Sequence, residues 1–391
     1  MPVLPYNLSP LLPLLCVGLL VAAGPLLWVA WRQRKAGPGE RLHALALVTL
    51  FLTFDLVLFG AFTRLSDSGL GCPDWPGCYG QASPLGAHAQ AQISAAQVDM
   101  PSGPVTHGKA WVEMLHRYLA TAVGVLITVL AVGAWRGRGA LPLPAPRAWL
   151  LPWLTLAWVC VQGAFGALTV TMKLFPAIVS LHLLGGYVLL ALLTLQCVQG
   201  RPRQNPLAAP VVLAPGLAVL LAAALVLLVL QAASGAWVST NYAVLACNTF
   251  PHCQGQWWPA MDFARAFELW RPLGESADGQ ILSVQALTAI HVAHRLMAMG
   301  TALVLATLAW RLHRHAALRT PARALAALLA AQLATGLSNV VLGWPLLAAI
   351  LHTGGAGALV VLLVWLLATT RVRRAAPARS PHRSLQPGFS E

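Results

Sequence analysis

Charged side chains are scarce in this chain of 391 residues: Asp, Glu, Lys and Arg make up 9% of it, against 58% hydrophobic residues. Soluble domains carry roughly 25% charged residues, so a water-soluble globule is excluded. The regular alternation of polar and apolar residues that a transmembrane β-barrel needs is also lacking. The composition therefore predicts a membrane protein built from helices.

Nine apolar runs are long enough to cross about 30 Å of hydrocarbon. Because lipid offers no hydrogen-bond partner to an unpaired backbone group, each run is expected to form a helix. The predicted spans lie near residues 10–31, 43–63, 111–135, 147–170, 176–198, 209–238, 285–310, 322–342 and 345–369.

Acidic residues are rarer than basic ones, 11 against 25, which leaves a net charge of +14. This excess does not indicate nucleic-acid binding, because it gathers in every second connection between spans and in the C-terminal tail. Cytoplasmic loops carry such an excess. We therefore predict a multi-pass protein of a bacterial-type inner membrane with a cytoplasmic C-terminus. The basic clusters lie at 32–41, 136–147, 201–203, 311–323 and 371–383.

The first span has a long apolar core, and its basic residues follow rather than precede it. A cleaved signal sequence has the opposite arrangement and is the alternative. We expect an uncleaved helix that starts on the outer side.

Two stretches of the chain repeat one pattern, and a duplicated unit predicts two similar sites, one in each half. The offset between matching positions is constant from the glycines to the cysteines, and it changes only slightly at the histidines. The matches are Gly60-Ala61-Phe62 with Gly235-Ala236-Trp237, Cys72 with Cys247, Cys78 with Cys253, Gly80 with Gly255, His116 with His294, and His182 with His352.

With the first span set aside, each copy holds four spans, so both copies insert the same way up about a pseudo-twofold axis. We predict an all-α integral membrane protein with two pseudosymmetric four-helix transmembrane bundles plus one extra N-terminal transmembrane helix. The predicted units are 1–42, the extra helix and a basic cytoplasmic loop; 43–204, the N-terminal bundle; 205–370, the C-terminal bundle; and 371–391, a basic, disordered cytoplasmic tail.

Four histidines fall inside predicted spans at a similar depth from the outer face, although ionisable groups are costly in a bilayer. In each copy they come from the second and fourth helices, which run parallel. Two imidazoles that face each other across a bundle core suit a porphyrin with six-coordinate iron. The alternatives are hydrogen-bonding helix residues, or zinc with His291 as a further ligand in one copy. The four are His116, His182, His294 and His352.

Glu113 stands one helical turn before His116, where the other copy has His291. A carboxylate at this spacing projects into the same cavity as the histidine and suits proton transfer or electrostatic stabilisation of a substrate. The N-terminal copy is therefore the candidate for chemistry, and the C-terminal copy is the candidate for a permanent electron carrier. In the alternative interpretation, Glu113 is solvated at the membrane boundary or paired with a nearby arginine.

Cysteine is sparse, with seven in the chain. Two pairs lie in long, Gly- and Pro-rich loops that we place outside, on the periplasmic side, where disulfides persist. Each pair is interpreted as a structural staple or as a redox-active couple, and metal binding by the second pair with His252 is a third option. The pairs are Cys72 with Cys78 and Cys247 with Cys253, whereas Cys16, Cys160 and Cys197 lie within spans and are expected to pack.

The run from Gly60 to Pro76, GAFTRLSDSGLGCPDWP, resembles the signature of the heme A synthase family of cytochrome oxidase assembly proteins. The resemblance covers about residues 43–370, and the extra first helix departs from it. Further matches, in the order found in that family, are Glu113-x-x-His116-Arg117, His182, His294-Arg295 and His352.

This resemblance implies an enzyme, an oxidoreductase that converts a methyl group of heme O to a formyl group by successive hydroxylations and so makes heme A for cytochrome oxidase. Implied partners are membrane lipid, an electron donor, heme O synthase and cytochrome oxidase assembly factors, and a homo-oligomer is compatible with it. The implied roles are heme b as cofactor on His294 and His352, heme O as substrate on His116 and His182, Glu113 as catalytic residue, and disulfides Cys72–Cys78 and Cys247–Cys253.

Arg64, Arg117 and Arg295 are candidate partners of heme propionates, because a guanidinium group pairs with a carboxylate through two hydrogen bonds. An arginine beside an interfacial helix end also serves as a snorkelling anchor. Two other functions compete. A di-heme b-type cytochrome that only transfers electrons would use the four histidines without Glu113, and a transporter, suggested by the repeat, would bind no iron.

Overall fold

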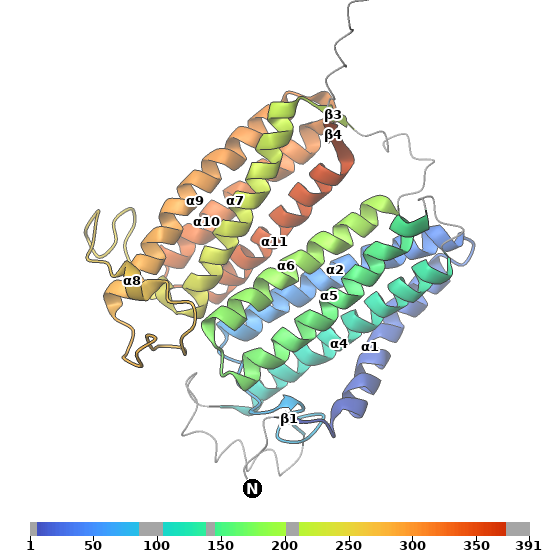
Figure 1. The fold of residues 1–391 in the computed structure, drawn as a ribbon, viewed down its shortest axis with the longest axis horizontal. Coiled ribbons are helices and arrows are strands. Elements are labelled where there is room, and N and C mark those ends of the chain that lie inside the picture. The colour runs from blue at the N-terminus through green and yellow to red at the C-terminus, as the bar shows by residue number, and fades with distance from the viewer. Residues whose placement is uncertain (1–5, 86–104, 138–144, 201–210, 373–391) are drawn as a thin grey trace, which may run out of the picture.

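The computed structural model describes residues 6–85, 105–137, 145–200 and 211–372. Within these ranges, nine helices are long and apolar enough to cross a membrane, which confirms the prediction of an all-α integral membrane protein (Figure 1). They are α1 (Leu11–Arg32), α2 (Pro38–Leu65), α4 (His107–Arg136), α5 (Ala145–Thr171), α6 (Pro176–Gln199), α7 (Pro215–Thr240), α9 (Val284–His313), α10 (Arg319–Val341) and α11 (Leu346–Thr369).

The helices gather into two groups of four, with α2, α4, α5 and α6 in one and α7, α9, α10 and α11 in the other (Figure 1). Helix α1 lies against α4 on the outside of the first group. This is the predicted pair of four-helix bundles with one extra helix. The bundles meet through α2 and α6 of the first and α7 and α11 of the second.

Repeated positions meet each other at the boundary between the bundles. The Arg64 guanidinium donates to the carbonyl oxygen of Ser239 at 3.0 Å, and the Tyr242 hydroxyl donates to the Asp67 carboxylate at 2.7 Å. The members of both pairs are separated by the offset that relates Gly60 to Gly235. Equivalent residues contact each other only close to a twofold axis, so these contacts mark the pseudo-twofold axis between the bundles.

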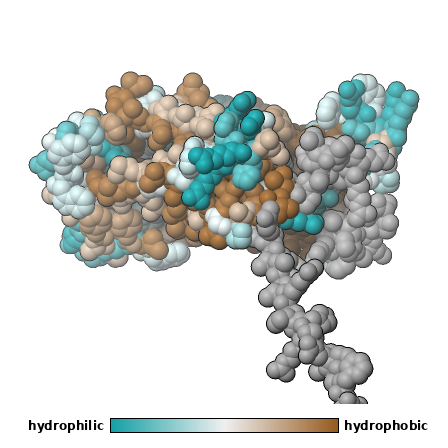
Figure 2. Space-filling view, turned by 90° about the horizontal axis from the view of Figure 1, so that it is seen from above, coloured by the Kyte–Doolittle hydropathy of each residue, from teal (hydrophilic) through white to brown (hydrophobic). Residues whose placement is uncertain are grey.

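Large apolar side chains are exposed along the helices, where a soluble protein would carry polar ones. Leu20 of α1, Val219 of α7 and Leu303 of α9 are 75%, 68% and 70% exposed, and hydrophobic residues cover broad areas of the face seen in Figure 2. Exposed apolar surface on this scale requires a nonpolar environment. The helix surfaces are therefore suited to contact with lipid.

The extra helix α1 is tied to the loop that carries the first cysteine pair. The strand β1 (Tyr6–Asn7) pairs in parallel with β2 (Trp75–Pro76) of that loop, and Leu14 is buried in a cluster with both of its cysteines. A Cβ at Gly18 would lie 2.4 Å from the side chain of Thr121, so the glycine permits close approach of α1 to α4. Helix α1 thus braces the loop above the N-terminal bundle.

Two short strands close the opposite end of the C-terminal bundle. The strand β3 (Val211–Leu213) pairs with β4 (Thr370–Val372), and α7 then begins at Pro215, whose missing N–H costs nothing in the first helical turn. The sequence predicted a disordered tail from residue 371. Arg371 and Val372 pair with β3, so the strand extends two residues past that boundary; residues 373–391 lie outside the described ranges.

Both cysteine loops lie at the same end of the helices, with β1 and α8 (Phe263–Ala266), while β3 and β4 lie at the other end (Figure 1). Short 3-10 helices, Ala243–Ala246 and Ala316–Leu318, complete the described secondary structure. The end with the cysteine loops is called the loop end below.

Candidate functional site

The four histidines lie at nearly one level below the loop end. Counted from the first residue of its helix, His116 is nine residues into α4 and His294 ten into α9, whereas His182 and His352 are each six into α6 and α11. At 1.5 Å per residue these positions are roughly 9 to 15 Å from the helix ends. Within each half the two imidazoles are close enough to interact electrostatically, His116 with His182 and His294 with His352.

Each imidazole also lies against a glycine of a neighbouring helix. A Cβ at Gly60 would be 3.0 Å from Nε2 of His116, and one at Gly235 would be 3.0 Å from Cε1 of His294. A methyl group there would press on the ring, so the glycines preserve room for it. Gly166 and Gly336 stand in the same relation to His182 and His352, at 3.4 and 3.1 Å.

Gly166 and Gly336 were not predicted as site residues. They are related by the same offset as His182 and His352, which is the signal that identifies them. The paired imidazoles, each with a glycine beside it, are compatible with a planar macrocycle whose iron takes one nitrogen from either side.

The surroundings of the two pairs differ. In the C-terminal half, the Ser234 hydroxyl lies 2.8 Å from Nδ1 of His294, and the Thr335 hydroxyl lies 3.0 Å from Nδ1 of His352. The side-chain nitrogen of Gln231 lies 3.1 and 3.3 Å from the two ring nitrogens of His294. Polar groups therefore contact both rings of this pair.

In the N-terminal half, the rings have fewer polar neighbours among the residues that the structure describes. The ring of Phe59 stacks on His116 with an interplanar angle of 8° and a centroid distance of 6.2 Å. The Nδ1 atom of His182 is buried and has no hydrogen-bond partner among the described residues. Packing thus dominates around this pair, with one ring nitrogen left unsatisfied.

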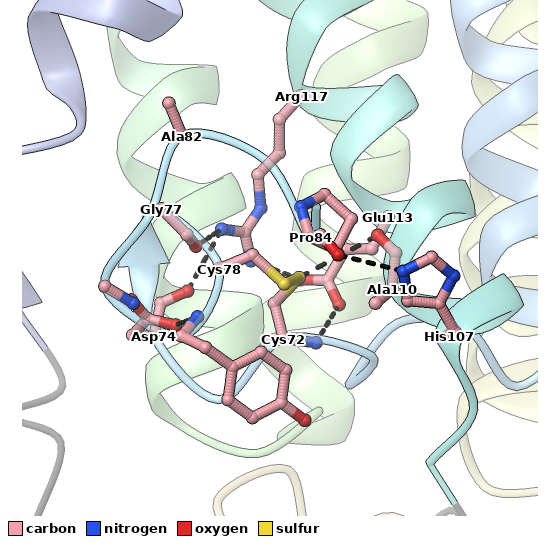
Figure 3. Close-up of a disulfide and its surroundings, with 12 residues drawn as sticks. Cys72, Asp74, Gly77, Cys78, Ala82, Pro84, His107, Ala110, Glu113 and Arg117 are labelled. Carbon is pink, nitrogen blue, oxygen red and sulfur yellow. Dashed lines mark hydrogen bonds and ion pairs between the residues drawn. A yellow bond between two sulfur atoms is a disulfide. The ribbon is translucent and has the colours of Figure 1, made fainter. Parts of the chain in front are cut away.

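Glu113 is buried, with 4% of its surface exposed, and it faces the first cysteine loop (Figure 3). One carboxylate oxygen accepts the backbone N–H of Cys72 at 2.9 Å, and the other forms an ion pair with Arg117. Of the alternatives left open, pairing with an arginine is the one observed, and solvation at the membrane boundary is not. Glu113 therefore connects the helix that carries His116 to the loop above it.

Arg117 binds backbone carbonyl oxygens of the same loop. Its guanidinium donates to Asp74 and Pro76 at 3.0 Å each, and also to Gly77. The Asp74 carboxylate in turn accepts the backbone N–H groups of Tyr79 at 2.6 Å and Gly80 at 2.8 Å. This network fixes the turn between the two cysteines against α4.

The other half repeats the arrangement with a histidine in place of the carboxylate. Arg295 donates from Nε to His291 at 3.3 Å. Its remaining nitrogens donate to the carbonyl oxygens of Cys247, Thr249 and His252 at 2.9 to 3.0 Å. An i,i+4 pair on the second helix of each half thus holds the loop, and the pairs differ in charge.

Both predicted disulfides are present, Cys72–Cys78 and Cys247–Cys253. Because its sulfur atoms are joined to each other, the second pair offers no thiolate ligands. The described residues contain no group of three or more His, Cys, Asp or Glu side chains that could hold a metal ion. The third option, a metal site at the second cysteine pair, therefore has no support among these residues.

A buried tyrosine lies in the first cysteine loop. Burial, with Glu113 and Asp74 nearby, raises the pKa of Tyr79 to about 12. Tyr79 therefore loses its proton only in a more alkaline medium than an exposed tyrosine would need.

The three arginines proposed as propionate partners have protein partners in the structure. Arg117 and Arg295 hold loop carbonyls, and Arg64 bridges the bundles through Ser239 and the hydroxyl of Tyr242, the latter at 2.9 Å. A propionate role for them stays a prediction. Arg117 and Arg295 each follow a candidate ligand histidine, and Arg64 lies near the end of α2. None of these positions indicated in the sequence which protein groups the arginines would contact.

Comparison with known proteins agrees with this architecture. Residues 43–364 match the family described as Cytochrome oxidase assembly protein, which leaves α1 outside the match. A protein named Heme A synthase from Shewanella oneidensis is 41% identical over 325 residues, 83% of this chain and 95% of that protein. Proteins of the same name from Rhodospirillum centenum and Rhizorhabdus wittichii are 31% and 26% identical, over 88% and 85% of this chain and 91% and 95% of theirs. The chain belongs to the cytochrome oxidase assembly protein family, as the resemblance in its sequence implied.

Proposed function

We propose that this protein is a heme A synthase, an oxidoreductase that converts a methyl group of heme O to a formyl group and so supplies heme A to cytochrome oxidase. The relatives of this name align with it over most of its length. The observation that carries the proposal is the occurrence of two imidazole pairs at one level inside two bundles, one of them beside a buried carboxylate.

The two pairs are assigned different hemes. We place a resident heme b on His294 and His352, whose rings have polar partners. Heme O, the substrate, is placed on His116 and His182, because Glu113 lies one turn from His116. The glycines beside the rings and the orphaned Nδ1 of His182 fit ligation of this kind.

The reaction replaces C–H bonds of one methyl group in two steps. The first hydroxylation gives a primary alcohol, and the second gives a geminal diol that loses water to leave the aldehyde. The bound hemes supply the redox chemistry, with oxygen and electrons from outside the chain. Loss of water from the diol needs proton movement, a role for which the Glu113 carboxylate is suited.

Arg117 supports this role of Glu113. Its guanidinium forms an ion pair with the buried carboxylate, while the Cys72 N–H fixes the orientation of the group. The disulfide closes the loop that provides this N–H. We propose a structural role for both disulfides.

We propose that the loop end lies outside, in the periplasm, and the C-terminus in the cytoplasm, because the basic residues gather in the connections at the other end of the helices. We propose that heme O, which is insoluble in water, arrives from its synthase through the lipid phase and that heme A leaves the same way to assembly factors. The bundles 43–204 and 205–370 are proposed as the substrate and cofactor units. The exposed apolar surface of α1 is compatible with a homo-oligomer.

A di-heme cytochrome that only transfers electrons is the second candidate. Electron transfer across a membrane requires hemes at different depths, whereas the histidine pairs lie at one level. Such a protein would also have no use for Glu113 buried beside one pair. Both features favour the enzyme.

Heme analysis of cells tests the proposed function. We expect cells that make heme O but lack a heme A synthase to accumulate heme A when they express this protein, as identified by chromatography and mass spectrometry of extracted hemes. The matched control carries the double change His116→Ala and His182→Ala. Extracts that contain heme O alone, despite normal membrane levels of the protein, would refute the activity.

A further inference from the structure

The Ser234 hydroxyl donates its proton to a backbone carbonyl and not to the histidine that it contacts. Ser234 Oγ donates to the backbone carbonyl of Gln231 at 2.8 Å, within its own helix. The same oxygen lies 2.8 Å from Nδ1 of His294. Since its only proton is used on the carbonyl, the hydroxyl can bond to the ring only as an acceptor.

Thr335 has the same arrangement on the facing side of the C-terminal pair. Its Oγ1 donates to the carbonyl of Ala331 at 2.8 Å and lies 3.0 Å from Nδ1 of His352. Again the hydroxyl is left to accept. Two helices of the bundle, α7 and α10, thus present one acceptor to each ring of the pair.

An acceptor at Nδ1 determines the tautomer of a neutral imidazole. With the hydroxyl as acceptor, the proton sits on Nδ1 and the lone pair is on Nε2. The Gln231 amide nitrogen, 3.1 Å from Nδ1 and 3.3 Å from Nε2 of His294, then donates to Nε2. A metal-binding histidine with its other N–H bonded in this way is fixed in orientation and is a more basic ligand. Ser234 and Thr335 therefore prepare both rings of the C-terminal pair to bind iron through Nε2.

The N-terminal pair lacks both acceptors. By the offsets that relate the two copies, the positions of Ser234 and Thr335 correspond to Phe59 and Phe165. Phe59 stacks on His116, and Nδ1 of His182 is buried without a partner among the residues described. Neither ring of this pair has a hydroxyl at these positions that would fix its tautomer.

Other features of the surroundings are common to both halves and do not explain the difference. Each ring has its glycine, and Gln162 and Gln332, which are equivalent in the repeat, lie against the equivalent Gly185 and Gly355. Gln231, by contrast, corresponds to Leu56. The contrast among these positions is therefore confined to the two hydroxyls and Gln231.

We propose that Ser234 and Thr335 are positioning residues that make the C-terminal pair a tight, resident heme site, and that phenylalanine at the equivalent positions makes the N-terminal pair an exchange site. A synthase must release its product, whereas its cofactor should stay bound. The inference rests on the proposed function in requiring that both pairs bind heme.

Removal of the hydroxyls should loosen the resident heme. In the double variant Ser234→Ala, Thr335→Val, we expect heme b to transfer to excess apomyoglobin faster by about 10- to 100-fold, the range typical for loss of such a partner. The midpoint potential measured by optical titration should rise, because a less basic ligand favours ferric iron less. The conservative exchanges Ser234→Thr and Thr335→Ser keep a hydroxyl at each position, so the transfer rate and the midpoint potential should match those of the unaltered protein.

Thr307→Val is the matched control, since this hydroxyl in α9 bonds to the Leu303 carbonyl of its own helix; transfer rate and potential should not change. If the double variant does not accumulate, the reciprocal Phe59→Ser, Phe165→Thr variant replaces it and should retain heme O or heme A through purification. Unchanged transfer and potential, or no added retention in the reciprocal variant, would overturn the inference. A wild-type protein without any heme would instead refute the proposed function.

Discussion

Replacement of Glu113 by alanine is expected to lower heme A formation by at least about 100-fold, in the range assigned to a positioned acid or base. The resident heme should remain, because Glu113 lies on α4 of the other bundle. Heme O or its hydroxylated form should accumulate in its place. Extraction of hemes from cells that express the variant together with a heme O synthase measures all three species.

Glu113→Gln separates the chemical role of this residue from its structural one. The amide oxygen can still accept the Cys72 N–H, so the loop keeps this contact while the charge beside Arg117 is lost. We expect activity to fall nearly as far as with alanine, with better retention of the folded protein. Glu268→Gln, in the loop of the other half, is the control and should leave activity unchanged. Normal heme A output from Glu113→Ala would contradict a catalytic role.

His294→Ala or His352→Ala is expected to abolish the low-spin b-type spectrum of the purified protein, because a six-coordinate iron loses one of its two axial nitrogens. His116→Ala should retain that spectrum, since it alters only the substrate pair. Reduced-minus-oxidised spectra and pyridine hemochromogen assays give the spin state and the heme content of each variant.

His313→Ala is the matched control, an exposed histidine in the last turn of α9, the helix that carries His294. It should not change the spectrum. The opposite pattern, with the spectrum lost in His116→Ala and kept in His294→Ala, would exchange the assignments of the two halves. Loss in all variants, the control included, would indicate misfolding rather than loss of a ligand.

The helices were predictable because lipid imposes one solution on an apolar run. All nine spans are present within the described ranges, with differences at the ends that follow local chemistry. Helix α2 begins at Pro38 rather than near residue 43, because proline suits the first helical turn and Glu40 bonds back to the Gly37 N–H at 3.4 Å. Hydropathy does not record such caps.

The histidine pairs were predictable for a related reason: a repeat with nearly fixed offsets brings equivalent residues to equivalent places. The partners of the arginines were not predictable. Arg117 and Arg295 bind carbonyl oxygens of loops that are distant in the sequence, and any residue type offers a carbonyl. The sequence therefore contains no pattern that points to these contacts.

Ser234 and Thr335 were predictable in part: the sequence shows the difference between the two copies, but it does not show the contacts of the hydroxyls. Each is one turn or less from a repeated glycine, and comparison of the two copies position by position distinguishes a hydroxyl from a phenylalanine. Whether that hydroxyl meets a ring or the lipid depends on helix rotation, which the packing of four helices determines. The structure supplies this information through the distances to Nδ1.

A density map of the protein purified from cells that make heme O would show directly whether the histidine pairs hold hemes. We expect two porphyrins at the same level beneath the disulfide loops, one between His116 and His182 and one between His294 and His352. Four imidazoles that point apart, with no macrocycle between the members of either pair, would contradict it.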